Sequence, residues 1–372
     1  MKGRVIVTIS VGVLGSIVAL AQSQVPKLPA KPADAPPLSV QAPLDPGYAA
    51  LTAMCKTPPP ARGRGAGGGG GRGAAGGGRG PAPAAGVRDV KSEAIPGVIA
   101  AGQTWKFLWQ EEGNNGDGIV GTDDGGLLLA QNDNSKVVKL DKNGKPSIAY
   151  SDTHTGGALS ISPKKTTFVV ERGLHQRIEQ LAPQRKVFAD MYNGEPLDCI
   201  GGVINDITAD SKGGVYFTMG GVYHADPKGM ITKYGENITP NGIVLSADEK
   251  TLYVTNGMTM AAFDVQPDGS LKNQREFGQL GAGGGDGSTI DAAGRVYVTY
   301  SEGVAVLSPE GKKLGTIPTP RGVITAAFGG KDKKMLYILA RGAVAADGSE
   351  VANAAQVWVI PMLAQGYKGR AK

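Results

Sequence analysis

Four short motifs in this sequence carry small side chains whose oxygen atoms could bind a cation. They are Asp117-Gly118, Asn205-Asp206, Asn241-Gly242 and Asp286-Gly287. Two carboxylates and two amides would form an oxygen-only site, which suits Ca²⁺, Mg²⁺ or Mn²⁺ and can accept Zn²⁺. Asn-Gly and Asp-Gly on their own are common turn dipeptides. The chemistry therefore depends on whether the fold brings the four motifs together.

One pattern recurs six times after residue 92: a polar turn, a run of β-branched, aliphatic or aromatic residues, and a second short strand. The spacing of about 40 residues is the period of a propeller blade. The runs are short and bounded by turn formers, which indicates strands and not helices. The first turn and strand of each copy are residues 123–126 and 127–130, 162–165 and 167–170, 210–214 and 215–218, 246–250 and 252–255, 291–294 and 296–299, and 331–334 and 336–339.

These copies predict an all-β fold, a six-bladed β-propeller over residues 92–367. No convincing amphipathic helix interrupts them, which argues against an α/β-hydrolase or a doubly wound sheet. A pair of sandwich domains would not explain why every copy carries the same turn. Residues 95–109 precede the first copy, and we expect them to supply the outer strand of the last blade and close the ring.

The four motifs occupy the same place in four blades, just before the inner strand and its turn. Because inner strands start at the central channel, equivalent positions on different blades converge on the axis of the ring. The shared register therefore predicts one divalent-metal site in the channel, formed by Asp117, Asn205, Asn241 and Asp286.

The segments around three of these motifs resemble the senescence marker protein-30/gluconolactonase-like family of six-bladed β-propeller lactonases. Residues 205–218 are similar to that family's "PND…D..G..YFT", residues 240–254 to "PNG…SPDE..LYV", and residues 285–298 to "DG…D..G..YV". Residues 328–337 resemble the "FGG.D…LY" of the last blade. The resemblance extends over residues 95–362.

This resemblance implies metal-dependent hydrolysis of a sugar-type lactone, by a hydrolase that acts on a carboxylic ester. The metal, with Ca²⁺ as the first expectation and Zn²⁺, Mg²⁺ or Mn²⁺ as alternatives, would polarise the lactone carbonyl or activate a bound water. Carried over, the metal ligands are Asp117, Asn205, Asn241 and Asp286, and Asn205 also contacts the substrate. Asp286 is the candidate catalytic base, because its carboxylate would lie beside that water.

Two departures from the family pattern bear on this site. The family has Glu-Gly-Pro in its first blade where this chain has Gly116-Asp117-Gly118, and Glu111 and Glu112 are alternative acids nearby. Residues 203–204 are apolar where many relatives have polar residues or proline before the equivalent of Asn205. The alternative functions are a non-catalytic propeller that binds a ligand or protein, and a related esterase with another substrate.

Two histidines are candidate substrate contacts at the mouth of the channel. His154 lies where the chain approaches the second blade, and His175 lies in a blade turn that resembles one of the family. The alternative for both is a hydrogen-bonded loop histidine. No serine or cysteine lies in a nucleophile-elbow pattern, which disfavours covalent catalysis.

The first 91 residues differ in composition from the propeller. Residues 1–21 combine two basic residues, an apolar stretch and a small-residue end, which predicts a signal peptide. The apolar stretch is too short for a comfortable membrane span. Residues 22–91 are rich in Pro, Gly and Arg and predict a disordered low-complexity linker, with a short ordered patch around residues 48–54 as an open alternative. We therefore expect a periplasmic or secreted protein without a membrane span.

Cysteine content and net charge limit the classes of partner that we expect for this protein. Cys55 and Cys199 are the only cysteines, and an exported protein permits a disulfide between them, although the sequence leaves the pairing open. The formal charge of +6 resides mainly in the leader and the linker. The propeller itself is nearly neutral and has no electrostatic footprint for nucleic acid. We expect a monomer whose partner is a small-molecule lactone.

Overall fold

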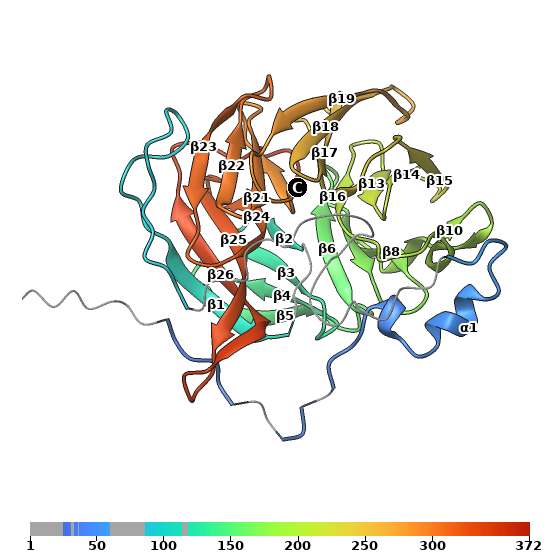
Figure 1. Cartoon of the computed structure of the whole chain (residues 1–372), viewed down its shortest axis with the longest axis horizontal. Coiled ribbons are helices and arrows are strands. Elements are labelled where there is room, and N and C mark those ends of the chain that lie inside the picture. The colour runs from blue at the N-terminus through green and yellow to red at the C-terminus, as the bar shows by residue number, and fades with distance from the viewer. Residues whose placement is uncertain (1–24, 31–32, 36, 60–85, 114–117) are drawn as a thin grey trace, which may run out of the picture.

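A ring of six antiparallel sheets makes up most of the molecule (Figure 1). The computed structural model of the chain describes residues 25–30, 33–35, 37–59, 86–113 and 118–372. Each of the six sheets has four strands, so the all-β, six-bladed propeller predicted from the repeats is confirmed. The predicted signal peptide, residues 1–21, lies outside the described residues.

In the first five blades the four strands follow one another along the chain, from the channel outward. Blade 1 contains β2 (Ile119–Gly121), β3 (Leu127–Gln131), β4 (Lys136–Leu140) and β5 (Pro146–Tyr150). Blade 2 contains β6 (Gly156–Ile161), β7 (Thr167–Glu171), β8 (Arg177–Ala182) and β9 (Lys186–Ala189). Blade 3 contains β12 (Ile207–Ala209), β13 (Val215–Thr218), β14 (Val222–Ala225) and β15 (Ile231–Tyr234). Blade 4 contains β16 (Pro240–Leu245), β17 (Thr251–Asn256), β18 (Thr259–Val265) and β19 (Leu271–Gln279), and blade 5 contains β20 (Ser288–Ile290), β21 (Val296–Tyr300), β22 (Gly303–Leu307) and β23 (Lys313–Pro318).

Blade 6 closes the ring with strands from both ends of the propeller. Its first three strands are β24 (Val323–Gly329), β25 (Met335–Val344) and β26 (Glu350–Pro361), and its outer strand is β1 (Lys106–Glu112). The expected closure is confirmed, although the strand begins at Lys106 and not at Ile95. The difference arises because Ile95, Val98 and Ile99 turn inward and are buried in the core between blades 5 and 6.

Apolar side chains between neighbouring blades form the core. Between blades 5 and 6, Tyr297 packs edge-on against Phe328 with ring centroids 4.9 Å apart. Between blades 2 and 3, Phe168 and Phe217 belong to one buried cluster. The strands nearest the channel are buried on both faces, which explains why they appear in the sequence as short apolar runs with weak alternation.

The inner strands surround the channel in the order β2, β6, β12, β16, β20 and β24. Residues 366–372 lie across the far ends of these strands, near the middle of the ring (Figure 1). Ala371 pairs with Ile161, the last residue of β6, and Gly366 pairs with Asp291, which follows β20. Arg370 donates hydrogen bonds to the carbonyl oxygens of residues 245 and 246. This end of the channel is therefore covered by the chain itself.

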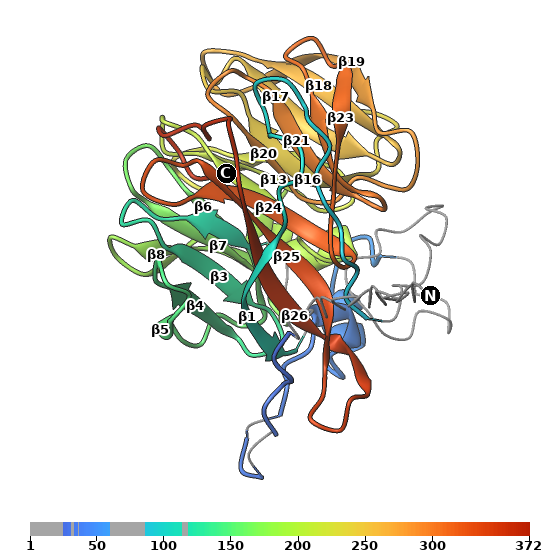
Figure 2. The ribbon, with the colours of Figure 1, turned by 90° about the vertical axis from the view of Figure 1, so that its left-hand side faces the viewer.

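A segment that we call the N-terminal arm, residues 37–59, packs on loops at the other end of the channel. It contains the short helices η1 (Ala42–Leu44) and α1 (Tyr48–Thr52). Figure 2 shows α1, in blue, and the C-terminal residues on opposite sides of the ring. Ser39 N–H donates to the carbonyl of Asp133 in blade 1 at 2.7 Å. None of the described helices is long and apolar enough to cross a membrane.

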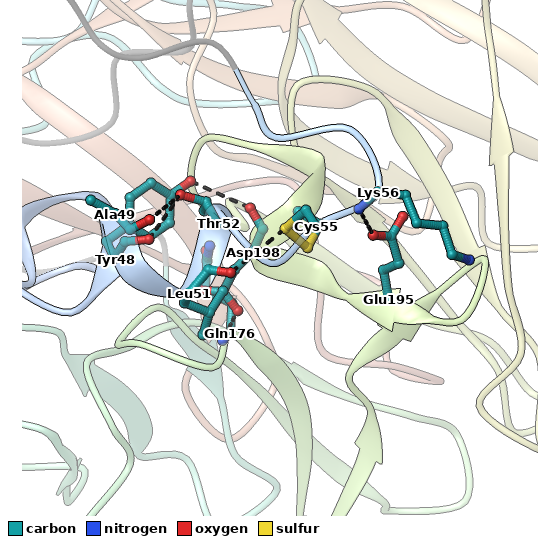
Figure 3. The surroundings of a disulfide bond; sticks show 10 residues. Tyr48, Ala49, Leu51, Thr52, Cys55, Lys56, Gln176, Glu195 and Asp198 are labelled. Carbon is teal, nitrogen blue, oxygen red and sulfur yellow. Dashed lines mark hydrogen bonds between the residues drawn. A yellow bond between two sulfur atoms is a disulfide. The ribbon is translucent and has the colours of Figure 1, made fainter.

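A disulfide anchors the arm to the segment that connects blades 2 and 3. Cys55 is bonded to Cys199 in the short helix η2 (Leu197–Ile200), so the pairing that the sequence left open is formed (Figure 3). Residues 37–59 thus differ from the expected disordered linker. The physical reason is long-range: the disulfide and backbone hydrogen bonds to blades 1 and 2 supply the ordering energy that the composition of the segment lacks.

Asp206 joins two inner strands and the C-terminal residues. Its Oδ1 accepts the N–H of Ile207 at 2.8 Å, and its Oδ2 accepts the N–H of Ile243 in the next blade at 2.9 Å. The ammonium of Lys372 forms an ion pair with Asp206, and both side chains are buried. Removing one partner of such a pair leaves the other charge buried and uncompensated.

We expect Asp206→Ala to lower the free energy of unfolding by about 3–5 kcal/mol, because the Lys372 ammonium then lacks its carboxylate. Asp264→Ala is the matched control, since Asp264 pairs with Arg275 at the surface and should matter much less. Denaturant unfolding of both variants measures the difference. Equal stabilities of the two variants would show that the Asp206 network does not hold the blades together.

Candidate functional site

Asn205, Asn241 and Asp286 take the same position in blades 3, 4 and 5. Each lies two residues before the inner-strand residue that starts regular pairing with the second strand. Those pairs are Ile207 with Phe217, Ile243 with Val254, and Ser288 with Val298. Because β12, β16 and β20 are neighbours around the channel, the structure brings these three predicted residues to one end of it. The fourth predicted ligand, Asp117, lies outside the described residues.

A buried threonine of the second strand holds the backbone at two of these positions. The N–H of Asn205 donates to the carbonyl of Thr218 at 2.7 Å, and the N–H of Asp286 donates to that of Thr299 at 2.8 Å. Both threonines are fully buried. The backbone at each position is therefore fixed by the neighbouring strand of its own blade.

In blade 4 the equivalent threonine, Thr255, holds the backbone through its side-chain hydroxyl group. The Thr255 oxygen accepts the N–H groups of Asn241 and Gly242, at 3.1 and 2.8 Å. The hydroxyl of Thr218 in blade 3 donates to the carbonyl of Asn241. Thr218 thus contacts the backbones of both Asn205 and Asn241 and links the two positions across the blade boundary.

Neighbouring inner strands approach so closely that no side chain fits after Asn241 or Asp286. A Cβ atom on Gly242 would lie 2.0 Å from the carbonyl oxygen of Asp286, and one on Gly287 would lie 2.1 Å from Thr325 Oγ1. The Asn-Gly and Asp-Gly motifs are therefore explained by close approach of the next inner strand, through the backbone of Asp286 at Gly242 and through Thr325 at Gly287.

The side-chain oxygens at this end of the channel fit a hard cation. Asn241 Oδ1 is buried and accepts no hydrogen bond among the described residues. Asn205 Oδ1 has a 3.3 Å contact with Arg172, and Asp286 Oδ2 has a 3.4 Å contact with Arg341. Leaving a buried acceptor unpaired costs roughly 1–3 kcal/mol, which a bound cation would offset. Two amide oxygens and one carboxylate are ligands that Ca²⁺ accepts.

The alternative first-blade acids lie away from the channel. Glu111 and Glu112 are on β1, the outer strand of blade 6. Glu111 forms an ion pair with Lys136 of β4 at 2.7 Å. The carbonyl of Glu112 accepts a hydrogen bond from Asn134. Neither is placed on an inner strand, so Asp117 is kept as the predicted first-blade ligand.

The two candidate substrate histidines lie in exposed loops. His154 precedes β6 and His175 follows β7, with positive φ angles of 41° and 64°. Partial desolvation lowers the pKa of His154, and the charge of Arg177 lowers it further. Among the described residues neither histidine forms a hydrogen bond with the three candidate ligands. Their contact with substrate stays a prediction.

Sequence analysis missed several residues that hold the site. The threonines carried a signal: Tyr216, Tyr253 and Tyr297 are each followed two residues later by the buried threonine that holds an inner strand. No sequence pattern indicated the contacts of Arg172 and Arg341, because these arginines lie far along the chain from Asn205 and Asp286. Only the closed ring brings them together.

The chain is similar to known proteins. The family model for the SMP-30/gluconolactonase/LRE-like region matches residues 159–341. Lactonase drp35 of Staphylococcus haemolyticus is 30% identical over 237 residues, which cover 56% of this chain and 71% of that protein. The chain belongs to this family. The resemblance found in the sequence motifs is confirmed.

Other comparisons define how far the similarity reaches. Lactonase drp35 of Staphylococcus epidermidis is 30% identical over 208 residues, covering 50% of this chain and 57% of that protein. The solved structure of a gluconolactonase from Xanthomonas campestris has a TM-score of 0.58 and 21% identity, covering 70% and 90% of the two chains. A calcium-binding protein, regucalcin, from Agrobacterium tumefaciens has a TM-score of 0.54 and 18% identity, covering 70% and 96%. At these identities the two structures show a shared fold.

The hydroxyl of Thr255 provides a test of how the site is held. We expect Thr255→Val to lower the free energy of unfolding by roughly 1–3 kcal/mol, because the N–H groups of Asn241 and Gly242 lose a buried acceptor. Thr255→Ser keeps the hydroxyl and is the matched control. Denaturant unfolding compares them. A valine variant as stable as the serine variant would mean that this hydroxyl does not fix the backbone.

Proposed function

We propose that this protein hydrolyses a sugar-type lactone with one divalent cation bound where β12, β16 and β20 begin. The observation that carries this proposal is the buried, unpaired Asn241 Oδ1 between two other oxygen-bearing positions. The family supports the reaction class, since relatives are named lactonase and gluconolactonase. The calcium-binding regucalcin supports a divalent ion and makes Ca²⁺ the first candidate.

Four residues of this chain would hold the cation: Asp117, Asn205, Asn241 and Asp286. When bound, such a cation acts as a Lewis acid toward the lactone carbonyl and lowers the pKa of a bound water. The neutral amides of Asn205 and Asn241 leave the cation more electrophilic than four carboxylates would. Asn205 would also contact the substrate.

Asp286 is the proposed catalytic base. Its backbone is held by Thr299 and its Oδ2 lies 3.4 Å from Arg341, so its carboxylate is oriented before substrate binds. The carboxylate would take a proton from the attacking water while the water oxygen bonds to the carbonyl carbon. The ring C–O bond then breaks, and the proton passes from Asp286 to the departing alkoxide. The product is an open-chain hydroxy acid.

We also propose that the protein acts in the periplasm or outside the cell. Residues 1–21 have the three parts of a signal peptide. The Cys55–Cys199 disulfide supports this location, because structural disulfides persist in oxidising compartments. Detection of the protein in the reduced cytosolic fraction alone would contradict it.

Lactone hydrolysis and its dependence on the cation can be tested together. We expect the purified protein to hydrolyse at least one of a panel of aldono-lactones, to lose this activity with chelator, and to regain it with one of Ca²⁺, Mg²⁺, Mn²⁺ or Zn²⁺. Asp286→Ala should lower kcat/KM by about 10²- to 10⁴-fold, the usual contribution of a general base. Asn241→Ala should raise the cation concentration needed for half-maximal activity.

Asp226→Ala is the control for these variants, because Asp226 lies in an exposed turn between β14 and β15. It should hydrolyse lactone like the unaltered protein. Full activity after chelation, or in Asp286→Ala, would contradict the proposal. A folded protein that turns over no lactone with any of the four metals would instead favour a binding propeller or a different ester substrate.

A further inference from the structure

A buried arginine of blade 2 donates hydrogen bonds to the backbone at Asn205 and the residue before it. Arg172 follows β7 and is 3% exposed. Its Nε donates to the carbonyl of Ile204 at 2.9 Å, and its Nη2 donates to the carbonyl of Asn205. The same Nη2 lies 3.3 Å from Asn205 Oδ1. One guanidinium group therefore contacts both the backbone and the side chain of a candidate ligand.

A buried glutamine four positions later holds the approach to Asn205. Gln176 is 1% exposed. Its Nε2 donates to the carbonyl of Gly202 at 3.1 Å, and its Oε1 accepts the N–H of Ile204 at 2.9 Å. The backbone N–H of Gln176 donates to Asp198 Oδ2 at 3.0 Å. Residues 198–205 are thus held along their length by the turn between β7 and β8.

Gly157 leaves space for the guanidinium group of Arg172 because glycine has no side chain. A Cβ atom there would lie 2.1 Å from Arg172 Nε. Gly157 is at the start of β6, the inner strand of blade 2. In this blade the guanidinium group therefore lies directly against the inner strand, with no space for another side chain.

The N-terminal arm holds Arg172 from outside the propeller. Ala42 N–H donates to the carbonyl of Arg172 at 2.7 Å, and Arg172 N–H donates to the carbonyl of Thr155 at 3.1 Å. The Thr155 hydroxyl donates to the carbonyl of Val40 at 3.1 Å. The arm, the loop before β6 and Arg172 therefore form one connected set of hydrogen bonds.

The N-terminal arm also contacts residues 195–199, which precede Asn205 in the chain. The Cys55–Cys199 disulfide lies a short distance before Asn205 in the chain (Figure 3). Tyr48 OH donates to the carbonyl of Asp198 at 3.4 Å. The N–H of Lys56 donates to Glu195 Oε1 at 2.5 Å, which is also drawn in Figure 3.

We propose that Arg172 and Gln176 are positioning residues that aim Asn205 at the cation, and that the disulfide-tethered arm keeps them in place. The inference rests on the proposed function, because it takes Asn205 as a cation ligand. An amide oxygen has two lone pairs, so Asn205 Oδ1 can accept from Arg172 and still bind a cation. Partners that orient a metal ligand typically contribute 10- to 100-fold to metal affinity.

A different view of Arg172 makes the opposite prediction. If its charge acted only by repelling the cation, then removing it would tighten cation binding. Positioning predicts weaker binding instead. The sign of the change in cation affinity therefore distinguishes the two roles, without any measurement of activity.

The test is calorimetric titration of the full chain with CaCl₂, and with MnCl₂ if Ca²⁺ does not bind. We expect Arg172→Gln to raise the dissociation constant about 10- to 100-fold. Arg172→Lys keeps the charge but loses the planar fork, so it should restore little of the affinity. Arg275→Gln is the control, because Arg275 pairs with Asp264 at the surface of blade 4, so this variant should bind the cation normally.

Two further variants keep the test decisive if Arg172→Gln does not fold. Gln176→Met removes the hydrogen bonds to Gly202 and Ile204 and should weaken cation binding, as Arg172→Gln does. Cys55→Ser with Cys199→Ser should weaken it several-fold and speed hydrogen exchange of residues 39–59. Unchanged or tighter cation binding in these variants, with normal binding by the unaltered protein, would overturn the inference alone. No binding of any cation by the unaltered protein would overturn the proposed function, and this inference with it.

Discussion

The constraint on which the site depends is the close approach of neighbouring inner strands at the channel. Between blades 4 and 5 the backbone of Gly242 passes so near the carbonyl of Asp286 that no Cβ atom fits between them. At that spacing the backbone of Asn241, which precedes Gly242, lies close to the backbone of Asp286, so the two candidate ligands start from one backbone cluster at one end of the ring. The cluster is thus a consequence of backbone packing, and buried threonines such as Thr255 fix it further.

Asp206 joins neighbouring inner strands through its side chain instead. It follows Asn205 at the register position that Gly242 and Gly287 occupy in the next two blades. Its carboxylate reaches across to the N–H of Ile243 and meets the Lys372 ammonium from the covered end of the channel. An acidic residue directly beside a candidate ligand is therefore committed to joining blades, which explains why Asn205, and not its neighbour, is the candidate ligand.

Local patterns in the sequence predicted those parts of the structure that depend on local interactions. In the first five blades the hydrogen-bonded strands are neighbours along the chain, so turns such as residues 210–214 identify these blades directly. The arm could not be predicted in this way, because its order comes from Cys55, whose partner is 144 residues distant. The hydrogen bonds from Arg172 to the backbone at Asn205 depend on packing between two blades and on the space left by Gly157. The strand expected from Ile95 begins later because its first residues fill the core.

The chemical type of each candidate ligand matches the arginine beside it. Arg172 is buried, so a carboxylate at position 205 would form a closed ion pair in a low-dielectric setting and have little capacity left for a cation. The neutral amide of Asn205 accepts from Arg172 and keeps a second lone pair. Asp286 faces Arg341, whose side chain is 39% exposed, so solvent weakens that pair. In the proposed site the uncharged ligand therefore lies beside the buried arginine and the charged ligand beside the more exposed one, so neither candidate ligand is closed into a buried ion pair with its arginine.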